Sequence, residues 1–137
     1  MPSIFDKLNL KDQSRIVVVN APASFEPSLR SLRGVAVDRH PEAAGDIAFA
    51  LAFVITQHEL DTLSASLAAS AQGDAILWFA YPKKTSRRYR CEFNRDTGWD
   101  VIRAAGFDSV RQVAIDEDWS ALRFRRIGFI GRSDGKG

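Results

Sequence analysis

The sequence predicts an α/β protein with three layers, a mostly parallel sheet and an antiparallel hairpin at its C-terminal edge. Three observations carry this prediction. Apolar runs at residues 15–20, 46–55 and 75–81 have the composition of strands that are buried on both faces. Segments with apolar residues at helical spacing separate these runs. Two further strand-like segments flank a turn of three acidic residues near the C-terminus, which is typical of a hairpin.

Composition and charge are those of an ordinary globular protein. The 137 residues are 45% hydrophobic and 26% charged, enough for a single core. We therefore expect an N-terminal extension at 1–14, one α/β domain at 15–130 and a disordered tail at 131–137. A net charge of +2 does not by itself predict a nucleic-acid partner. The single cysteine, the lack of a secretory signal and an apolar run about half as long as a membrane span predict a cytoplasmic protein with no membrane partner.

The N-terminal half is expected to hold three strands and one helix. The run at 15–20 is rich in β-branched residues and ends abruptly in a polar turn. Phe25, Leu29 and Leu32 have helical spacing, and Gly34 can end that helix. The predicted elements are an apolar anchor (Ile4, Phe5 and Leu8), a strand at 15–20, a helix at 25–32, a strand at 35–38, a loop at 40–45 and a strand at 46–55.

The C-terminal half is expected to hold two helices and three strands. Thr56 and Glu59 form a capping box for a helix whose apolar stripe is Leu60, Leu63, Leu67 and Ala71, with Gly73 at its end. Pro82 stops the central strand at 75–81. The remaining predicted elements are a basic loop at 85–94, a helix capped by Asp96 or Thr97 with the stripe Trp99, Ile102 and Ala105, a strand at 109–115 in which Val110 is one of the alternating residues, a turn at 116–118 and a strand at 119–129.

Two segments of the chain match the signature motifs of a known family. One reads Leu-Trp-Phe-Ala-Tyr-Pro-Lys-Lys at 77–84, and the other reads Asp-Glu-Asp-Trp-Ser-Ala-Leu-Arg-Phe at 116–124. Together with 17–22 and 46–60, they resemble bacterial domain-of-unknown-function family 3052. This resemblance implies a small intracellular α/β protein and carries over no catalytic residue. The order of elements in the second half is also similar to the end of a Rossmann-like methyltransferase domain, so we expect a Rossmann-like sheet.

Candidate ligand-binding residues follow the predicted strands, because ligands of open α/β sheets bind outside the carboxyl ends of the strands. The turn after the first strand lacks the glycines of a dinucleotide or methyltransferase loop, and Pro22 removes a backbone donor there, so no cofactor is predicted. The leading hypothesis is a non-catalytic binding or regulatory module, whose partner is a phosphate-containing small molecule or a protein. Its anion-binding rim consists of Asn20, Ala21, Ser24, Asp38, Thr56, His58, Lys83 and Lys84.

Two alternative functions stay open. Asp38 closes the second strand, where an acid can bind the ribose of an adenosyl cofactor, so one alternative is an atypical S-adenosylmethionine-dependent enzyme. The other is a nucleic-acid-binding protein that uses the basic loop with Arg87, Arg88 and Arg90 around Tyr89. The same cations can instead pair with the acidic turn at 116–118 as an ordinary solvated loop.

Other reactive side chains give no further site. No cysteine or carboxylate lies at ligand spacing from His40 or His58, so no metal is predicted, and no nucleophilic triad is present. Cys91 is expected to be a neutral thiol. Trp119 is expected to pack in or beside the core, and the Asp-x-x-Trp-Ser segment at 116–120 to form a structural corner.

Overall fold

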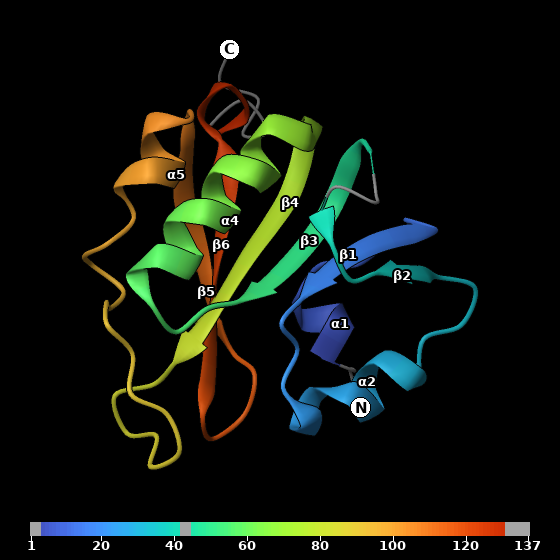
Figure 1. Ribbon diagram of the computed structural model, residues 1–137. Coiled ribbons are helices and arrows are strands. Elements are labelled where there is room, and N and C mark those ends of the chain that lie inside the picture. The colour runs from blue at the N-terminus through green and yellow to red at the C-terminus, as the bar shows by residue number, and fades with distance from the viewer. Residues whose placement is uncertain (1–3, 42–44, 131–137) are drawn as a thin grey trace.

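The computed structural model describes residues 4–41 and 45–130 (Figure 1). Part of the loop predicted at 40–45 and the whole tail predicted at 131–137 lie outside these residues. The elements in chain order are α1 (Ile4–Lys7), β1 (Arg15–Val19), the 3-10 helix η1 (Ala23–Phe25), α2 (Glu26–Arg30), β2 (Ala36–Asp38), β3 (Ile47–Phe53), α4 (Gln57–Ser70), β4 (Ala71–Pro82), α5 (Asp100–Ala104), β5 (Phe107–Ala114), β6 (Trp119–Arg126) and the 3-10 helix η2 (Ile127–Phe129).

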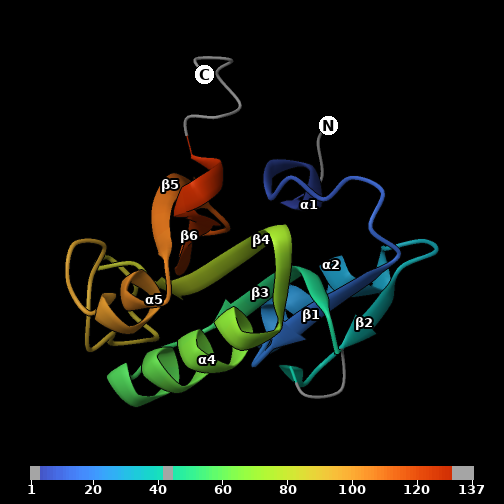
Figure 2. The same ribbon diagram turned by 90° about the horizontal axis from the view of Figure 1, so that it is seen from above.

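The strands form one sheet in the order β2-β1-β3-β4-β6-β5. Neighbouring strands from β2 to β4 are parallel, and β6 is antiparallel to both β4 and β5. Helices α4 and α5 pack on one face of the sheet and α1 and α2 on the other, as the view from above shows (Figure 2). The predicted fold class, a three-layer Rossmann-like fold with a mostly parallel sheet, is confirmed.

The C-terminal hairpin lies at the sheet's edge, and its returning strand is inserted into the sheet. Strand β6 pairs with β4 on one side and β5 on the other, so β5 is the outer strand. This register places Tyr81 of β4 opposite Ser120 of β6. The bounds of the hairpin differ from the prediction: β5 spans Phe107–Ala114 and not 109–115, and β6 ends at Arg126 because residues 127–129 turn into η2. Val110, one of the alternating residues, is 40% exposed.

Helix α4 begins as predicted. The Thr56 hydroxyl accepts the Glu59 amide at 3.1 Å, and the Glu59 carboxylate accepts the Thr56 amide at 3.1 Å, which completes the capping box. Its residues Leu60 and Leu67 are buried against the sheet.

The end of α4 was predicted wrongly. The helix stops at Ser70, and β4 begins at Ala71, which is buried and pairs with Ile47. Gly73 therefore lies inside the strand rather than at a helix end. Its φ of 54° is a left-handed conformation that glycine adopts without steric cost, and it falls where the register between β3 and β4 shifts.

Two helices are shorter than predicted. Neither Asp96 nor Thr97 caps α5, because the Asn94 carboxamide oxygen accepts both of their backbone amides and holds a separate turn before the helix. Trp99 is the residue at the N-cap, and Ala105 is exposed instead of joining the buried stripe. The helix predicted at 25–32 is divided between η1 and α2.

The N-terminal apolar anchor closes the face of the sheet opposite α4. Phe5 and Leu8 are buried there, and the indole nitrogen of Trp78 donates to the Leu8 carbonyl at 2.8 Å. Segment 4–10 is thereby tied to the middle of β4. None of the helices in residues 4–41 and 45–130 has the length and hydropathy of a membrane-spanning segment.

The segment at 116–120 forms the predicted corner. The Asp116 carboxylate accepts the backbone amides of Asp118 at 2.8 Å and Trp119 at 2.9 Å, and the Trp119 carbonyl accepts the Ile115 amide at 3.0 Å. The Trp119 ring is buried against Phe53, with 5.1 Å between ring centroids. The corner thus fixes the start of β6.

Candidate binding site

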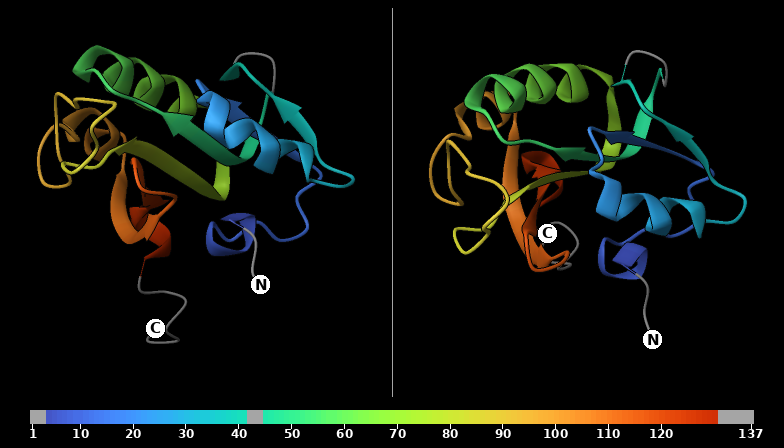
Figure 3. Two further views of the ribbon diagram at one scale, coloured as in Figure 1. Left: turned by 90° about the horizontal axis from the view of Figure 1, so that it is seen from below. Right: turned by 60° about the horizontal axis from the view of Figure 1, so that its bottom comes forward.

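The carboxyl ends of β1, β3 and β4 lie at the same edge of the sheet, which Figure 3 shows from below. Two cavities open at this edge. The smaller one, which we call the crevice, has a volume of about 290 Å³, and the larger one, which we call the basic cavity, about 770 Å³. The structure thus divides the predicted rim between two separate cavities.

The crevice lies between the ends of β1 and β2 and the first turns of α4. Asn20 has a φ of 60°, and its side-chain amide donates to the Phe53 carbonyl at 3.4 Å, so it bridges the carboxyl ends of β1 and β3. Asparagine tolerates this left-handed conformation better than most residues. The lining residues are Val19, Asn20, His40, Pro41, His58, Glu59, Thr62 and Leu63.

Two of the first backbone amides of α4, those of Gln57 and Glu59, have acceptors within the protein. The Gln57 amide donates to the Glu92 carboxylate at 2.8 Å, and the Glu59 amide donates to the Thr56 hydroxyl. The Glu59 carboxylate also accepts the Ile55 amide at 2.9 Å. A helix N-terminus binds an external anion through free amides. The amides of Gln57 and Glu59 are therefore not free for an anionic ligand, and the carboxylates of Glu59 and Glu92 lie beside them.

Asp38 lies outside both cavities. Its carboxylate is 2.9 Å from the Arg15 guanidinium, and only 16% of its side chain is exposed. Ala21, Ser24 and Thr56 are also absent from the lining of either cavity. Of the residues predicted for the β1–β3 part of the rim, Asn20 and His58 are brought together, and His40 joins them.

The basic cavity lies beyond the carboxyl end of β4, under the loop at 83–98. Lys83, Lys84 and Arg90 of the predicted residues contribute to it. Loop contacts hold this arrangement: the Lys83 amide donates to the Asp118 carbonyl at 2.8 Å, and the Ser86 hydroxyl donates to the Asp118 carboxylate at 2.9 Å. The lining residues are Tyr81, Pro82, Lys83, Lys84, Ser86, Tyr89, Arg90, Cys91, Glu92, Phe93, Asn94, Arg95, Asp96, Thr97, Gln112 and Ser120.

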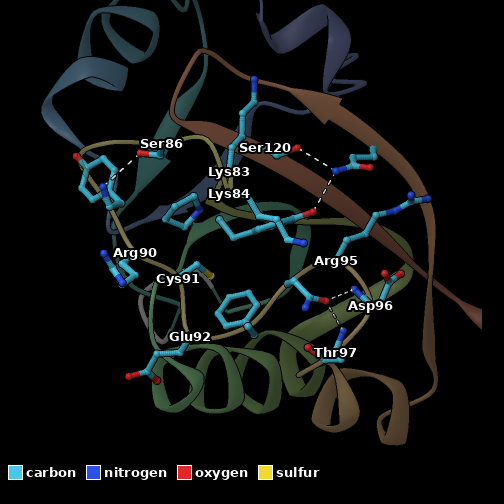
Figure 4. Close-up of a pocket in the computed structure, with 16 residues that line it drawn as sticks. Lys83, Lys84, Ser86, Arg90, Cys91, Glu92, Arg95, Asp96, Thr97 and Ser120 are labelled. Atoms are coloured by element: carbon cyan, nitrogen blue, oxygen red, sulfur yellow. Dashed lines mark hydrogen bonds between the residues drawn. The ribbon is translucent and has the colours of Figure 1, made fainter.

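The floor of the basic cavity is a hydrogen-bonded cluster of three side chains. The Gln112 amide nitrogen donates to the Tyr81 hydroxyl at 3.0 Å and to the Ser120 hydroxyl at 3.1 Å (Figure 4). Burial raises the pKa of Tyr81, while Ser120 and Arg95 act in the opposite direction. Burial likewise raises the pKa of Cys91, which keeps its thiol neutral. The cavity therefore presents protonated hydroxyl and thiol groups at neutral pH.

The basic run is divided by the fold. Arg90 lines the cavity, whereas Arg88 lies 3.8 Å from the Asp118 carboxylate and is largely exposed. Arg87 is exposed and lines neither cavity. The pairing of loop cations with the acidic turn, considered from the sequence, is therefore observed for Arg88.

The sequence analysis did not predict several of the lining residues as part of a site, among them Gln112, Ser120 and Arg95. Gln112 and Ser120 come from β5 and β6, some 30–40 residues after Tyr81, and meet it only through strand pairing. Arg95 lies beyond the C-terminal end of the basic run at 83–90. In residues 4–41 and 45–130, no group of three or more histidine, cysteine or acidic side chains could hold a metal ion.

Comparisons with known proteins find similar folds among solved structures. No protein-family model and no curated protein matches the chain, so the resemblance to family 3052 stays a prediction. Among solved structures, a SAM dependent methyltransferase from Aquifex aeolicus aligns with 89% of this chain and 87% of its own, at 14% identity and a TM-score of 0.61. The N-methyltransferase NodS from Bradyrhizobium japonicum WM9 aligns with 90% of this chain and 92% of its own, at 12% identity and a TM-score of 0.56. TrmN from Thermus thermophilus aligns with 90% of this chain and 47% of its own, at 9% identity and a TM-score of 0.57. At these identities the likeness is one of fold.

Proposed function

We propose that this protein is an atypical S-adenosylmethionine-dependent enzyme that binds the cofactor at the crevice. The observation that supports this most is the position of the crevice in a methyltransferase-like fold. Ligands of open α/β sheets bind where the strand order reverses. In this sheet β1 has β2 on one side and β3 on the other, so the reversal lies at the ends of β1 and β3, beside Asn20.

The crevice fits an adenosyl ligand in part. Asn20 supplies the left-handed backbone that a glycine otherwise provides, and His40 and His58 offer ring faces and nitrogens to a base. Pro22 provides no amide to the turn. Asp38 is the last residue of β2, where an acid would bind ribose hydroxyls, but it is paired with Arg15. A ribose must therefore displace Arg15 from this acid, which predicts weak binding.

Amide-resolved NMR titration of the whole chain with S-adenosylmethionine tests the proposal. We expect saturable shifts centred on Asn20, His40 and His58. Arg15→Ala releases Asp38 and should tighten binding several-fold, whereas Asp38→Asn should weaken it. Arg33→Ala removes an exposed cation away from the crevice and should leave binding unchanged. An absence of shifts at millimolar cofactor would refute the proposal.

A second function, a non-catalytic binding module, is favoured by one specific observation. The carboxylates of Glu59 and Glu92 occupy backbone amides at the start of α4 that an enzyme of this fold could offer to a ligand. The two functions differ in turnover. Incubation with S-adenosylmethionine and a small-molecule cell extract yields S-adenosylhomocysteine if the protein is an enzyme, and leaves the cofactor intact if it is a module.

A further inference from the structure

The basic cavity has an unbalanced charge. Its cationic side chains outnumber its acidic ones by four to two; they are Lys83, Lys84, Arg90 and Arg95 against Glu92 and Asp96. The Glu92 carboxylate is already hydrogen-bonded to the start of α4. Within the described ranges, none of the four cations forms an ion pair. Figure 4 shows Lys84 across the middle of the cavity, with Arg90 and Arg95 on opposite sides. The opening is therefore electropositive.

The floor of the same cavity holds buried hydroxyls. Tyr81 is 5% exposed and Ser120 is 6% exposed, yet both line the cavity. The Tyr81 oxygen accepts a hydrogen bond from Gln112, and a hydrogen bond between the Tyr81 and Ser120 side chains opposes the effect of burial on the pKa of Tyr81. Burial keeps this hydroxyl protonated by raising the pKa of Tyr81. Each of the two hydroxyls carries one proton, so a hydrogen bond between them leaves one proton that an acceptor atom of a ligand can accept.

The walls are held in place before any ligand binds. One end of the loop is anchored by Ser86 on the corner residue Asp118, and the other by Glu92 on α4. The Gln57 side chain also donates to the Gly98 carbonyl at 2.8 Å. A preformed cavity avoids the entropic cost of ordering a loop on binding.

From this geometry we infer that the basic cavity binds a small organic anion, with its carboxylate or phosphate group against Lys84, Arg90 and Arg95 and an acceptor atom on the paired hydroxyls of Tyr81 and Ser120. This site is distinct from the crevice and does not depend on the function proposed there. The volume of about 770 Å³ lies within the range of small-molecule sites.

A small molecule fits these features better than a nucleic acid. A polynucleotide backbone is bound by cations along an extended surface. Here the cations surround a concave site whose buried floor only a small group can reach, and the loop's two other arginines, Arg87 and Arg88, lie outside it. The net charge of +2 also provides little long-range attraction for a polyanion.

The experiment is an NMR titration of the whole chain with phenyl phosphate and with benzoate, using benzyl alcohol as the uncharged control. The two anions distinguish a phosphate from a carboxylate ligand. We expect saturable shifts at the amides of Lys84 and Arg95 and at the Gln112 side-chain amide, with at least one anion and not with the alcohol. Shifts from S-adenosylmethionine fall instead on Asn20, His40 and His58, so the failure of one site is separable from the failure of the other.

Variants then identify the groups responsible. Lys84→Ala with Arg95→Ala should weaken the bound anion about tenfold or more, and Tyr81→Phe, which keeps the ring, about three- to tenfold. Arg87→Ala removes a loop cation outside the cavity and should change affinity less than about twofold. A uniform loss across all three variants, or no saturation by about 10 mM of either anion, overturns the inference. So does binding that strengthens with oligonucleotide length and loses affinity with salt by a slope of about 0.7 per phosphate.

Discussion

The Glu92 carboxylate accepts the backbone amide of Gln57 at 2.8 Å, and the Glu92 amide donates to the Ile55 carbonyl at 3.0 Å. These two bonds join the loop at 83–98 to the first turn of α4. The loop lines the basic cavity, while α4 lines the crevice. Glu92 therefore stabilises the wall of one site and occupies an amide beside the other.

Replacing Glu92 tests this link. Glu92→Ala removes the acceptor of the Gln57 amide and should lower the free energy of unfolding by about 1 kcal/mol, since the amide then turns to water at a helix terminus. Urea denaturation measures the loss. Glu117→Ala removes an exposed acid of the same charge in the acidic turn and should cost less than about 0.5 kcal/mol. Equal costs for the two variants would show that the Glu92 contact does not contribute.

Gly98 is required where the loop meets α4. It has a φ of 98°, and a Cβ there would lie 2.7 Å from the Phe93 Cβ and 2.8 Å from the Gln57 side-chain oxygen. Gly98→Ala should therefore destabilise the fold by about 2 kcal/mol or more, through backbone strain plus displacement of both neighbours. Gly34 has a φ of 70° with nothing within 4 Å of the position, so Gly34→Ala reports strain alone. Thermal unfolding of the pair separates the two effects, and an equal loss would exclude the clash.

Two buried tryptophans should respond differently to replacement by phenylalanine. Trp78 donates its indole N–H to Leu8, whereas the indole N–H of Trp119 is buried without a partner in the described ranges. Trp78→Phe loses packing and leaves the Leu8 carbonyl unpaired, so it should lower the free energy of unfolding by about 3 kcal/mol. Trp119→Phe loses packing too, but it removes a buried indole N–H that has no hydrogen-bond partner among the described residues. Its loss of unfolding free energy should therefore be smaller than that of Trp78→Phe by about 1 kcal/mol or more. Chemical denaturation monitored by circular dichroism decides, and a larger loss for Trp119 would contradict the account.

The ionisation of Tyr81 is measurable because the chain has only two tyrosines. In Tyr89→Phe, the phenolate absorbance of Tyr81 should titrate above about 10, the ordinary value, because burial disfavours the charged form. In urea the midpoint should return to about 10. The stabilising contribution of the neutral hydroxyl is thus present below the unfolded pKa and is lost as pH rises through the higher folded pKa. A native midpoint at or below the urea value would show that Tyr81 is not buried as described.

The sequence by itself determined the elements whose signals are local. Each of these signals depends on residues within a few positions of one another. They are the β-branched run of β1, the apolar run of β3 and the capping box of Thr56 and Glu59. Strands that alternate with helices form βαβ units, and the two strands of such a unit are parallel with a right-handed crossover. The fold class followed from these segments.

Only the tertiary structure decided how distant segments meet. The insertion of β6 beside β4 brings Ser120 and Gln112 to Tyr81, and no local pattern marks that pairing. The end of α4 was likewise set by the burial of Ala71 against Ile47 and not by Gly73. Strand pairing also brings Arg15 beside Asp38, where the two side chains form an ion pair. The predicted rim residues lie in two separate cavities because their positions depend on how the strands pair. Local propensity and periodicity act over a few residues, whereas a site depends on contacts whose sequence separation leaves no signal in either.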